Sequence, residues 1–239
     1  MSSLTPELIK QLALAGDDFG FEMRIGKILR QLPNATVDHG GLYTPRGINQ
    51  TPRQFDYRVK FGDKTHSIRL AVECKNFFPG SPVVVCGSKR TVAESRQDAI
   101  VSDLRIGVDA NDRGDQRFVG LRLLSKPADL YPPDAFVGKA TIRPDPGASK
   151  EKELVPGSRY KLTGDSDAYE RWNQAVSHSI YLADVAAAER VRNGPRFSAV
   201  LPIFVVPEST LWTIEYDTDG NICAGPTMVA DTTLFIGST

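Results

Sequence analysis

Two neighbouring stretches of the chain alternate strictly between apolar and polar residues, and this pattern limits the fold more than any other feature. In the stretch 54–61 the apolar side chains are Phe55, Tyr57, Val59 and Phe61. In the stretch 67–75 they are Ile68, Leu70, Val72 and Cys74. Because successive side chains of a β-strand point to opposite faces, each stretch predicts a strand with one face packed on a core. The turn residues Gly62-Asp63-Lys64 between them predict an antiparallel hairpin.

The polar face of this hairpin holds the residues best suited to chemistry. On the second strand, Glu73 and Lys75 are separated by one residue and therefore point the same way, about 6.5 Å apart. Cys74 between them is expected to point into the core, and Arg69 and Ala71 share the polar face. Asp56 lies on the matching face of the first strand, so we expect Asp56, Glu73 and Lys75 to converge.

A pair of carboxylates beside an ammonium group suits the hydrolysis of a phosphodiester bond. Carboxylate oxygens bind hard cations such as Mg²⁺, which keep several of their waters. The cation lowers the pKa of a bound water and neutralises charge on the phosphate. A lysine orients the attacking water, and helps to deprotonate it if its own pKa is depressed. The alternative interpretation is a surface ion-pair ladder across the hairpin, which is nearly neutral energetically.

Helical periodicity flanks the hairpin. Thr5-Pro6-Glu7 predicts a helix start, and this helix is expected to end near Ala15. A second helix is expected over 19–32, because its apolar residues keep the 3.6-residue period, and Glu22 lies at the edge of the apolar stripe. A third helix is expected from Asp167 to Val191.

Further strands are expected before and after the hairpin. An early strand over 35–43 and a short one over 83–86 precede a helix predicted over 91–104. The stretch 130–156 is rich in proline, glycine and charge and predicts long loops. The nearly continuous apolar run 197–206 predicts a strand covered on both faces. The C-terminal segment predicts a closing hairpin, with its first strand at 211–216 and its turn at 217–221.

Composition excludes several classes of protein. The chain has 239 residues, of which 41% are hydrophobic and 24% charged, as in an ordinary globular protein. Its formal net charge is zero, so any basic surface must be local. Three cysteines without a CxxC pair favour neither a disulfide framework nor a zinc ribbon. With no signal-peptide pattern at its start and no apolar run of spanning length, the chain is expected to be cytoplasmic, with no membrane partner.

Four of these residues, in their order along the chain, resemble the PD-(D/E)xK, or restriction-endonuclease-like, nuclease superfamily. They are Glu22 in GFEMRIGKIL, Asp56 in RQFDYRV, and Glu73 and Lys75 in LAVECKN. The resemblance implies an α/β fold, with a mixed β-sheet flanked by helices and an αβββαβ core. It implies a single nuclease-like domain over residues 1–239. Residues 77–165 are then an insertion between the third core strand and the second core helix.

The resemblance also implies roles for these residues. Asp56 and Glu73 are implied to bind Mg²⁺ or Mn²⁺, together with the main-chain carbonyl of Cys74. Glu22 is implied to be the auxiliary acid near the metal, and the alternative interpretation is a solvated residue of the helix. Lys75 is implied to position or activate the attacking water. Phe55 stands where the name of the motif has proline.

The expected partner is nucleic acid, DNA rather than RNA. The residues expected to contact it are Arg53, Gln54, Arg58 and Gln174. Related nucleases often place a glutamine on the second core helix, but His178 stands where exonuclease-type members have tyrosine. A solvated basic face and an ordinary polar glutamine are the alternatives. The function expected is an endodeoxyribonuclease, with a homodimer or a partner subunit left open. The rival hypotheses are a non-catalytic module that keeps the nuclease fold, and a hydrolase of another phosphate ester.

Overall fold

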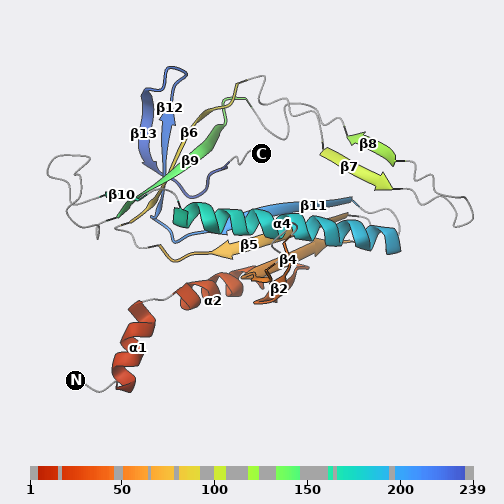
Figure 1. Ribbon diagram of the computed structural model, residues 1–239, viewed down its shortest axis with the longest axis horizontal. Helices are drawn as coiled ribbons and strands as arrows, with labels where there is room; N and C mark the ends of the chain where they lie inside the picture. The colour runs from red at the N-terminus through yellow and green to blue at the C-terminus, as the bar shows by residue number, and fades with distance from the viewer. Residues whose placement is uncertain are drawn as a thin grey trace, which may run out of the picture. The chain divides into compact units, whose positions relative to one another are not determined.

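The computed structural model defines a mixed α/β protein (Figure 1). The residues that it describes are 5–15, 18–45, 51–63, 66–77, 81–91, 100–105, 118–123, 133–145, 161–163, 166–193 and 197–234. The chain divides into two compact units. The first comprises Met1–Val83 with Arg143–Leu211, and the second Val84–Ile142 with Trp212–Thr239.

The first unit contains the elements that surround the candidate site. Its helices are α1 (Pro6–Ala15), α2 (Asp18–Leu29) and α4 (Ser166–Asn193). Its longer strands are β1 (Thr36–His39), β4 (Tyr57–Gly62), β5 (His66–Cys74) and β11 (Phe197–Val205). The two-residue strands β2 (Leu42–Tyr43) and β3 (Arg53–Gln54) pair with each other.

The four longer strands form one mixed sheet in the order β1-β4-β5-β11. β4 is antiparallel to both neighbours, with Val59 opposite Val37 of β1 and Leu70 of β5. β5 and β11 are parallel, with Leu70 opposite Leu201. The chain therefore passes through helix α2, three strands of the sheet, helix α4 and a fourth, parallel strand.

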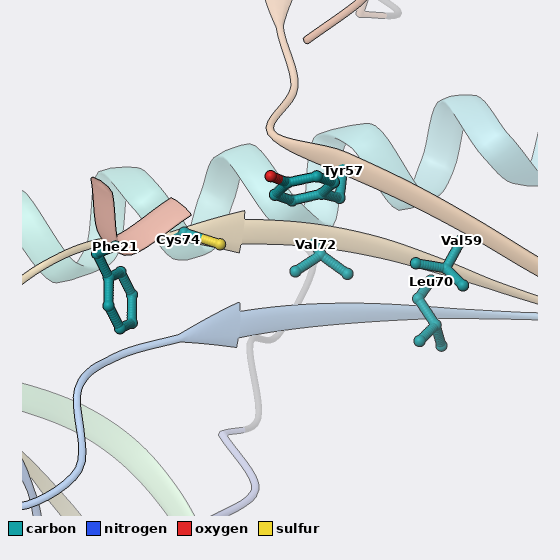
Figure 2. Close-up of a cluster of buried hydrophobic side chains, with 6 residues drawn as sticks. All are labelled: Phe21, Tyr57, Val59, Leu70, Val72 and Cys74. Atoms are coloured by element: carbon teal, nitrogen blue, oxygen red, sulfur yellow. The ribbon is translucent and has the colours of Figure 1, made fainter. Parts of the chain in front are cut away.

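One face of this sheet packs on α2. Its buried side chains form a cluster with one residue of α2: Phe21, Tyr57, Val59, Leu70, Val72 and Cys74 (Figure 2). The strand members of the cluster are those that the alternating pattern places on the core face. Gly26 allows α2 to approach closely, since a Cβ atom there would lie 2.2 Å from the hydroxyl oxygen of Tyr57. That hydroxyl group donates to the main-chain carbonyl of Glu22 at 3.0 Å.

The opposite face of the sheet packs on α4, which contacts β5 and β11 (Figure 1). The buried positions of α4 recur at helical spacing: Ala168, Ala175, His178, Leu182 and Ala186. On the sheet beneath, Arg69, Ala71 and Glu73 are buried. The expectation that this face points outward is therefore wrong, because α4 covers it. Conversely Ile68, expected in the core, is 39% exposed.

The first expected strand of the hairpin, 54–61, is broken in two. β3 pairs with β2 and β4 pairs with β1, and the break falls at Phe55 and Asp56. The early strand expected over 35–43 breaks at the same level, where Gly40 has a φ of 70°. Glycine adopts this conformation without strain. At this level the main-chain N–H of Gly40 donates to the carbonyl of Asp56 at 3.1 Å, and that of Phe55 donates to the carbonyl of Gly41 at 3.0 Å.

The remaining strands are β6 (Val83–Lys89), β7 (Ile100–Arg105), β8 (Phe118–Leu123), β9 (Phe136–Asp145), β10 (Lys161–Thr163), β12 (Leu211–Tyr216) and β13 (Ile222–Met228). They form a five-stranded sheet, β10-β9-β6-β12-β13, and the two-stranded sheet β7-β8. The expected strand at 83–86 and the closing hairpin β12-β13 are confirmed.

Two expectations for the middle of the chain are wrong. The end of the helix predicted over 91–104 is strand β7, and residues 92–99 lie outside the described part. The loops predicted over 130–156 contain strand β9, which pairs with β6. Both strands depend on pairing with distant residues rather than on local pattern. Among the helices that the structure describes, none combines the length and the apolar character needed to cross a membrane.

Candidate active site

Asp56 and Glu73 lie opposite each other on the α4 face of the sheet. Tyr57 is opposite Val72, so the same register continued by one residue places Asp56 opposite Glu73. Residues directly opposite in an antiparallel pair share a face. The Asp56 carboxylate is fastened to the neighbouring strand, because its Oδ2 accepts a hydrogen bond of 2.7 Å from the main-chain N–H of Cys74.

The side chain of Glu73 is fully buried, with 0% exposure. In the described part of the chain, neither of its carboxyl oxygens has a hydrogen-bond partner of normal geometry. The main-chain amide of Asp56 lowers the pKa of Glu73 only weakly. Burial, followed by the charge of Asp56, raises the pKa of Glu73 to about 9. Without a cation, Glu73 is therefore protonated at neutral pH.

Three carboxylates crowd this part of the unit. Burial raises the pKa of Asp56, and the charge of Glu22 raises it further, while the Cys74 amide opposes the shift. Glu22 also raises the pKa of Glu73. The positive charge of Arg171 opposes these shifts, because it lowers the pKa of both Glu73 and Asp56. The site is thus a set of acidic groups with one cation from α4 beside it.

Glu22 reaches this group from α2 and is held by aromatic residues of the sheet. Its Oε1 lies 2.7 Å from Nε2 of His39, on β1. The His39 ring stacks on Tyr57 with 4.7 Å between ring centres. Tyr57 in turn donates to the main chain of Glu22. These contacts fix the position of α2, and with it the carboxylate of Glu22, relative to β4.

Lys75 follows the last residue of β5 and continues its pairing, donating its amide to the Val205 carbonyl at 3.0 Å. Its ammonium group forms an ion pair with Asp18, the first residue of α2. Asp18 also accepts a 3.3 Å hydrogen bond from the amide of Asn76. The structure thus shows Lys75 paired with Asp18, a residue that sequence reasoning missed. Its only signal was an acid at a helix start.

The glutamine expected to contact nucleic acid instead fastens α4 to β3. Gln174 donates from Nε2 to the main-chain carbonyl of Gln54 at 2.7 Å. Its Oε1 accepts from Nη1 of Arg171 at 3.4 Å. The side chains of Arg53 and Gln54 are exposed on β3. Arg171 was also missed from the sequence, although it shares the helical period of the buried positions of α4.

Arg58, expected to contact nucleic acid, takes part in an aromatic stack. It donates from Nε to Nε2 of His178 at 2.8 Å, and its guanidinium group lies 3.8 Å from the ring centre of Phe55. The His178 ring stacks on Tyr43 and Phe55, at 4.9 and 4.8 Å between ring centres. Burial, helped by the charge of Arg58, lowers the pKa of His178 to about 3, so the imidazole is neutral.

The donor set fits a hard cation only in part. Among the described residues, no cluster of three or more His, Cys, Asp or Glu side chains is placed to hold a metal. Mg²⁺ is commonly bound by one or two carboxylates, with water and substrate oxygens completing the shell. The unpartnered oxygens of Glu73 opposite Asp56 supply such a pair, and a cation there would offset the charge that Glu73 gains when it loses its proton. A ligand role for the Cys74 carbonyl stays a prediction.

No model of a known protein family, no curated protein and no solved structure matches the chain. The resemblance to PD-(D/E)xK nucleases therefore rests on Glu22, Asp56, Glu73 and Lys75 themselves.

Proposed function

We propose that the chain is a metal-dependent nuclease that hydrolyses phosphodiester bonds in DNA. The proposal rests chiefly on one observation, the fully buried carboxyl group of Glu73 opposite the half-buried carboxylate of Asp56, with a raised pKa on each. Structural carboxylates are ordinarily paired with cations or hydrogen-bond donors when buried. The element order and the parallel pairing of β5 with β11 support a restriction-endonuclease-like core.

In this proposal Asp56 and Glu73 hold Mg²⁺ or Mn²⁺, and Glu22 is the auxiliary acid. The bound cation supplies an acidified water and neutralises phosphate charge. The Cys74 amide orients the Asp56 carboxylate. Asp18 holds the ammonium group of Lys75, which positions the attacking water. Because Glu73 must lose its proton to bind a cation, metal affinity should rise with pH up to about 9.

The proposed setting follows from the surface and the composition. The exposed side chains of Arg53 and Gln54 on β3 lie a few residues before Asp56, where they can contact DNA. The zero net charge leaves little general attraction for DNA, so recognition by a second copy or a partner subunit is part of the proposal.

A second candidate is a non-catalytic nucleic-acid-binding or assembly module that keeps the nuclease fold. Two observations favour it: Glu73 has no exposed surface, and Lys75 is paired with Asp18. In such a module the acidic groups would be a packing feature beneath α4. It would bind DNA without cutting it, and would not respond to Mn²⁺ through Glu73.

Cleavage of defined substrates separates the two candidates. Purified protein is incubated with supercoiled plasmid, linear duplex, single-stranded DNA and RNA, with and without Mn²⁺. We expect Mn²⁺-dependent DNA cleavage that Asp56→Asn abolishes and Lys75→Ala lowers by a factor of about 10². Asp38→Asn, an exposed carboxylate on β1, is the matched control and should cleave like the parent. A parent that cuts none of the DNA substrates, or an Asp56→Asn variant that cuts like the parent, would overturn the proposal.

A further inference from the structure

The sheet-facing row of α4 contains a charged residue among buried ones. Ala168 and Ala175 are both buried against the sheet. Arg171 lies three residues after the first and four before the second, so it belongs to the same row of the helix. A long cationic side chain between two alanines has room to lie along the helix and reach the strands below.

The other polar residues of this row each contact a polar group of the sheet. His178 accepts a hydrogen bond from Arg58 on β4. Glu189 pairs with Arg69 of β5 at 2.6 Å and with Lys60 at 3.1 Å. Because α4 runs along the sheet, the row places Glu189 over the basic end of this face.

At the other end of the row, Arg171 lies over the acidic end of the same face. Asp56 and Glu73 are the acidic groups there, and the positive charge of Arg171 lowers the pKa of Glu73. Hydrogen bonds hold it in place: Arg171 donates to Gln174, and Gln174 donates to the main chain of Gln54, two residues before Asp56. The guanidinium group is therefore tied to the strand that leads into Asp56.

We propose that Arg171 is a phosphate-binding residue of this site, contacting an oxygen of the DNA phosphodiester that is cut. The inference rests on the proposed nuclease function. Before a divalent cation binds, Arg171 offsets part of the charge of Asp56. Once the cation has taken over that charge, the planar guanidinium fork is available for the substrate phosphate, whose geometry it matches.

This role predicts opposite effects on the two ligands of the site. Arg171 and the divalent cation repel each other and share the same carboxylates, so removing the Arg171 charge should tighten cation binding. Removing it should weaken binding of a phosphodiester, because the charge-assisted hydrogen bonds are lost. If Arg171 were needed only for packing, its removal would weaken the binding of both ligands or change the binding of neither.

Two titrations on the full-length chain test the inference. Mn²⁺ is titrated by calorimetry, and a short labelled DNA duplex is titrated in Ca²⁺, each into the parent, Arg171→Gln, Arg171→Lys and Glu73→Gln. We expect Arg171→Gln to bind Mn²⁺ about threefold more tightly or better and the duplex about tenfold more weakly. Arg171→Lys keeps the charge but lacks the fork, so it should leave Mn²⁺ affinity near that of the parent and still lose duplex affinity. Lys27→Gln, an exposed cation of α2, controls for net charge and should match the parent.

The outcomes separate the inference from the function it rests on. If Mn²⁺ binding depends on Glu73 but both Arg171 variants bind Mn²⁺ and duplex like the parent, the inference is overturned and the proposed function stands. If Arg171→Lys binds Mn²⁺ and the duplex more weakly by the same factor, the inference is also overturned, because a structural role of Arg171 would explain both losses. If the parent binds no Mn²⁺, both fail together.

Discussion

At the scale of single residues, the charge state of Glu73 decides whether the site can bind a cation. The alternating pattern predicted that Glu73 shares a face with Asp56, and the strand register agrees. The pattern could not predict that Glu73 is buried, because burial comes from α4, about a hundred residues further along the chain. The same reason explains why Asp18 and Arg171 were missed: each meets the site through helix packing that no local pattern specifies.

Glu73→Gln should stabilise the metal-free protein at alkaline pH. The pKa of Glu73 is raised from 4.5 to about 9, so the folded state keeps a proton that the unfolded chain has already lost. This stability is full below about pH 4.5 and disappears as the pH rises towards 9. In EDTA, the parent should therefore lose stability between pH 6 and 9 relative to Glu73→Gln. At pH 8.5 we expect the variant to melt at a higher temperature than the parent. The difference should be about 2–4 °C for each kcal/mol by which the substitution raises the free energy of unfolding.

Thermal melts of parent and variant at pH 6 and 8.5 provide the measurement. Asp38→Asn, on the exposed surface of β1, is the control and should follow the parent at both values. A Glu73→Gln variant that is less stable than the parent at pH 8.5 would show that Glu73 is an ion-pair partner with a low pKa.

At the scale of elements, the long helices and the central strands could be predicted, and their junctions could not. A helix-start pattern predicted α1, helical periodicity predicted α4, and an apolar run predicted β11, each with small errors at its ends. The break between β3 and β4 was missed because apolar and polar residues alternate straight through it. Phe55 keeps the apolar alternation at the break, but its ring stacks on His178 of α4. Strands β7 and β9 were missed because long-range pairing overrides weak local preference.

His178 and Arg58 should be energetically coupled. His178→Ala removes a buried ring stacked on Tyr43 and Phe55, and should destabilise the protein by about 2–5 kcal/mol. Because Arg58 then loses its acceptor, the effects of His178→Ala and Arg58→Ala should not add, with a coupling of about 0.5–3 kcal/mol.

Urea unfolding of the two single variants and the double variant measures this coupling. The exposed Ile180→Ala on the same helix is the control, with an expected effect within about 0.5 kcal/mol. Additive effects of the two substitutions would mean that the hydrogen bond contributes nothing to the attachment of α4.

Gly26→Ala should loosen the packing of α2 on the sheet. A Cβ atom at this position would lie 2.2 Å from the hydroxyl oxygen of Tyr57, so the helix or the ring must move. Overpacking of this kind costs about 1–3 kcal/mol, more than the helix gains from alanine. Chemical denaturation should show the loss, while Lys27→Ala on the exposed side of α2 stays near the parent. Unchanged stability of Gly26→Ala would contradict the close approach of α2.

At the scale of the whole molecule, the sequence predicted the mixed α/β class. It did not predict that residues of the insertion join the C-terminal hairpin in one compact unit. That association depends on strand pairing between distant segments, because β6 of the insertion lies beside β12 of the C-terminal hairpin in the five-stranded sheet. The residues of the candidate site all belong to the first unit.

Divalent cations should stabilise the folded chain as a whole. A cation that binds only the folded state stabilises it by RT ln(1 + [L]/Kd), which is about 1.4 kcal/mol at ten times Kd. For a chain of this size that corresponds to a rise of about 3–6 °C in the melting temperature. Melts in Mg²⁺ and Mn²⁺ should show this rise for the parent and a much smaller one for Glu73→Gln. An undiminished response in Glu73→Gln would place the cation elsewhere.

The central claim is that Asp56 and Glu73 together hold a divalent cation, and anomalous diffraction from a crystal soaked in Mn²⁺ tests it most directly. We predict an anomalous peak with carboxylate oxygens of both residues about 2.1 Å from it, the distance expected for a small hard cation. The peak should be absent from crystals of Glu73→Gln treated in the same way. A parent crystal with no peak in saturating Mn²⁺, or with its peak bound by neither residue, would contradict the account.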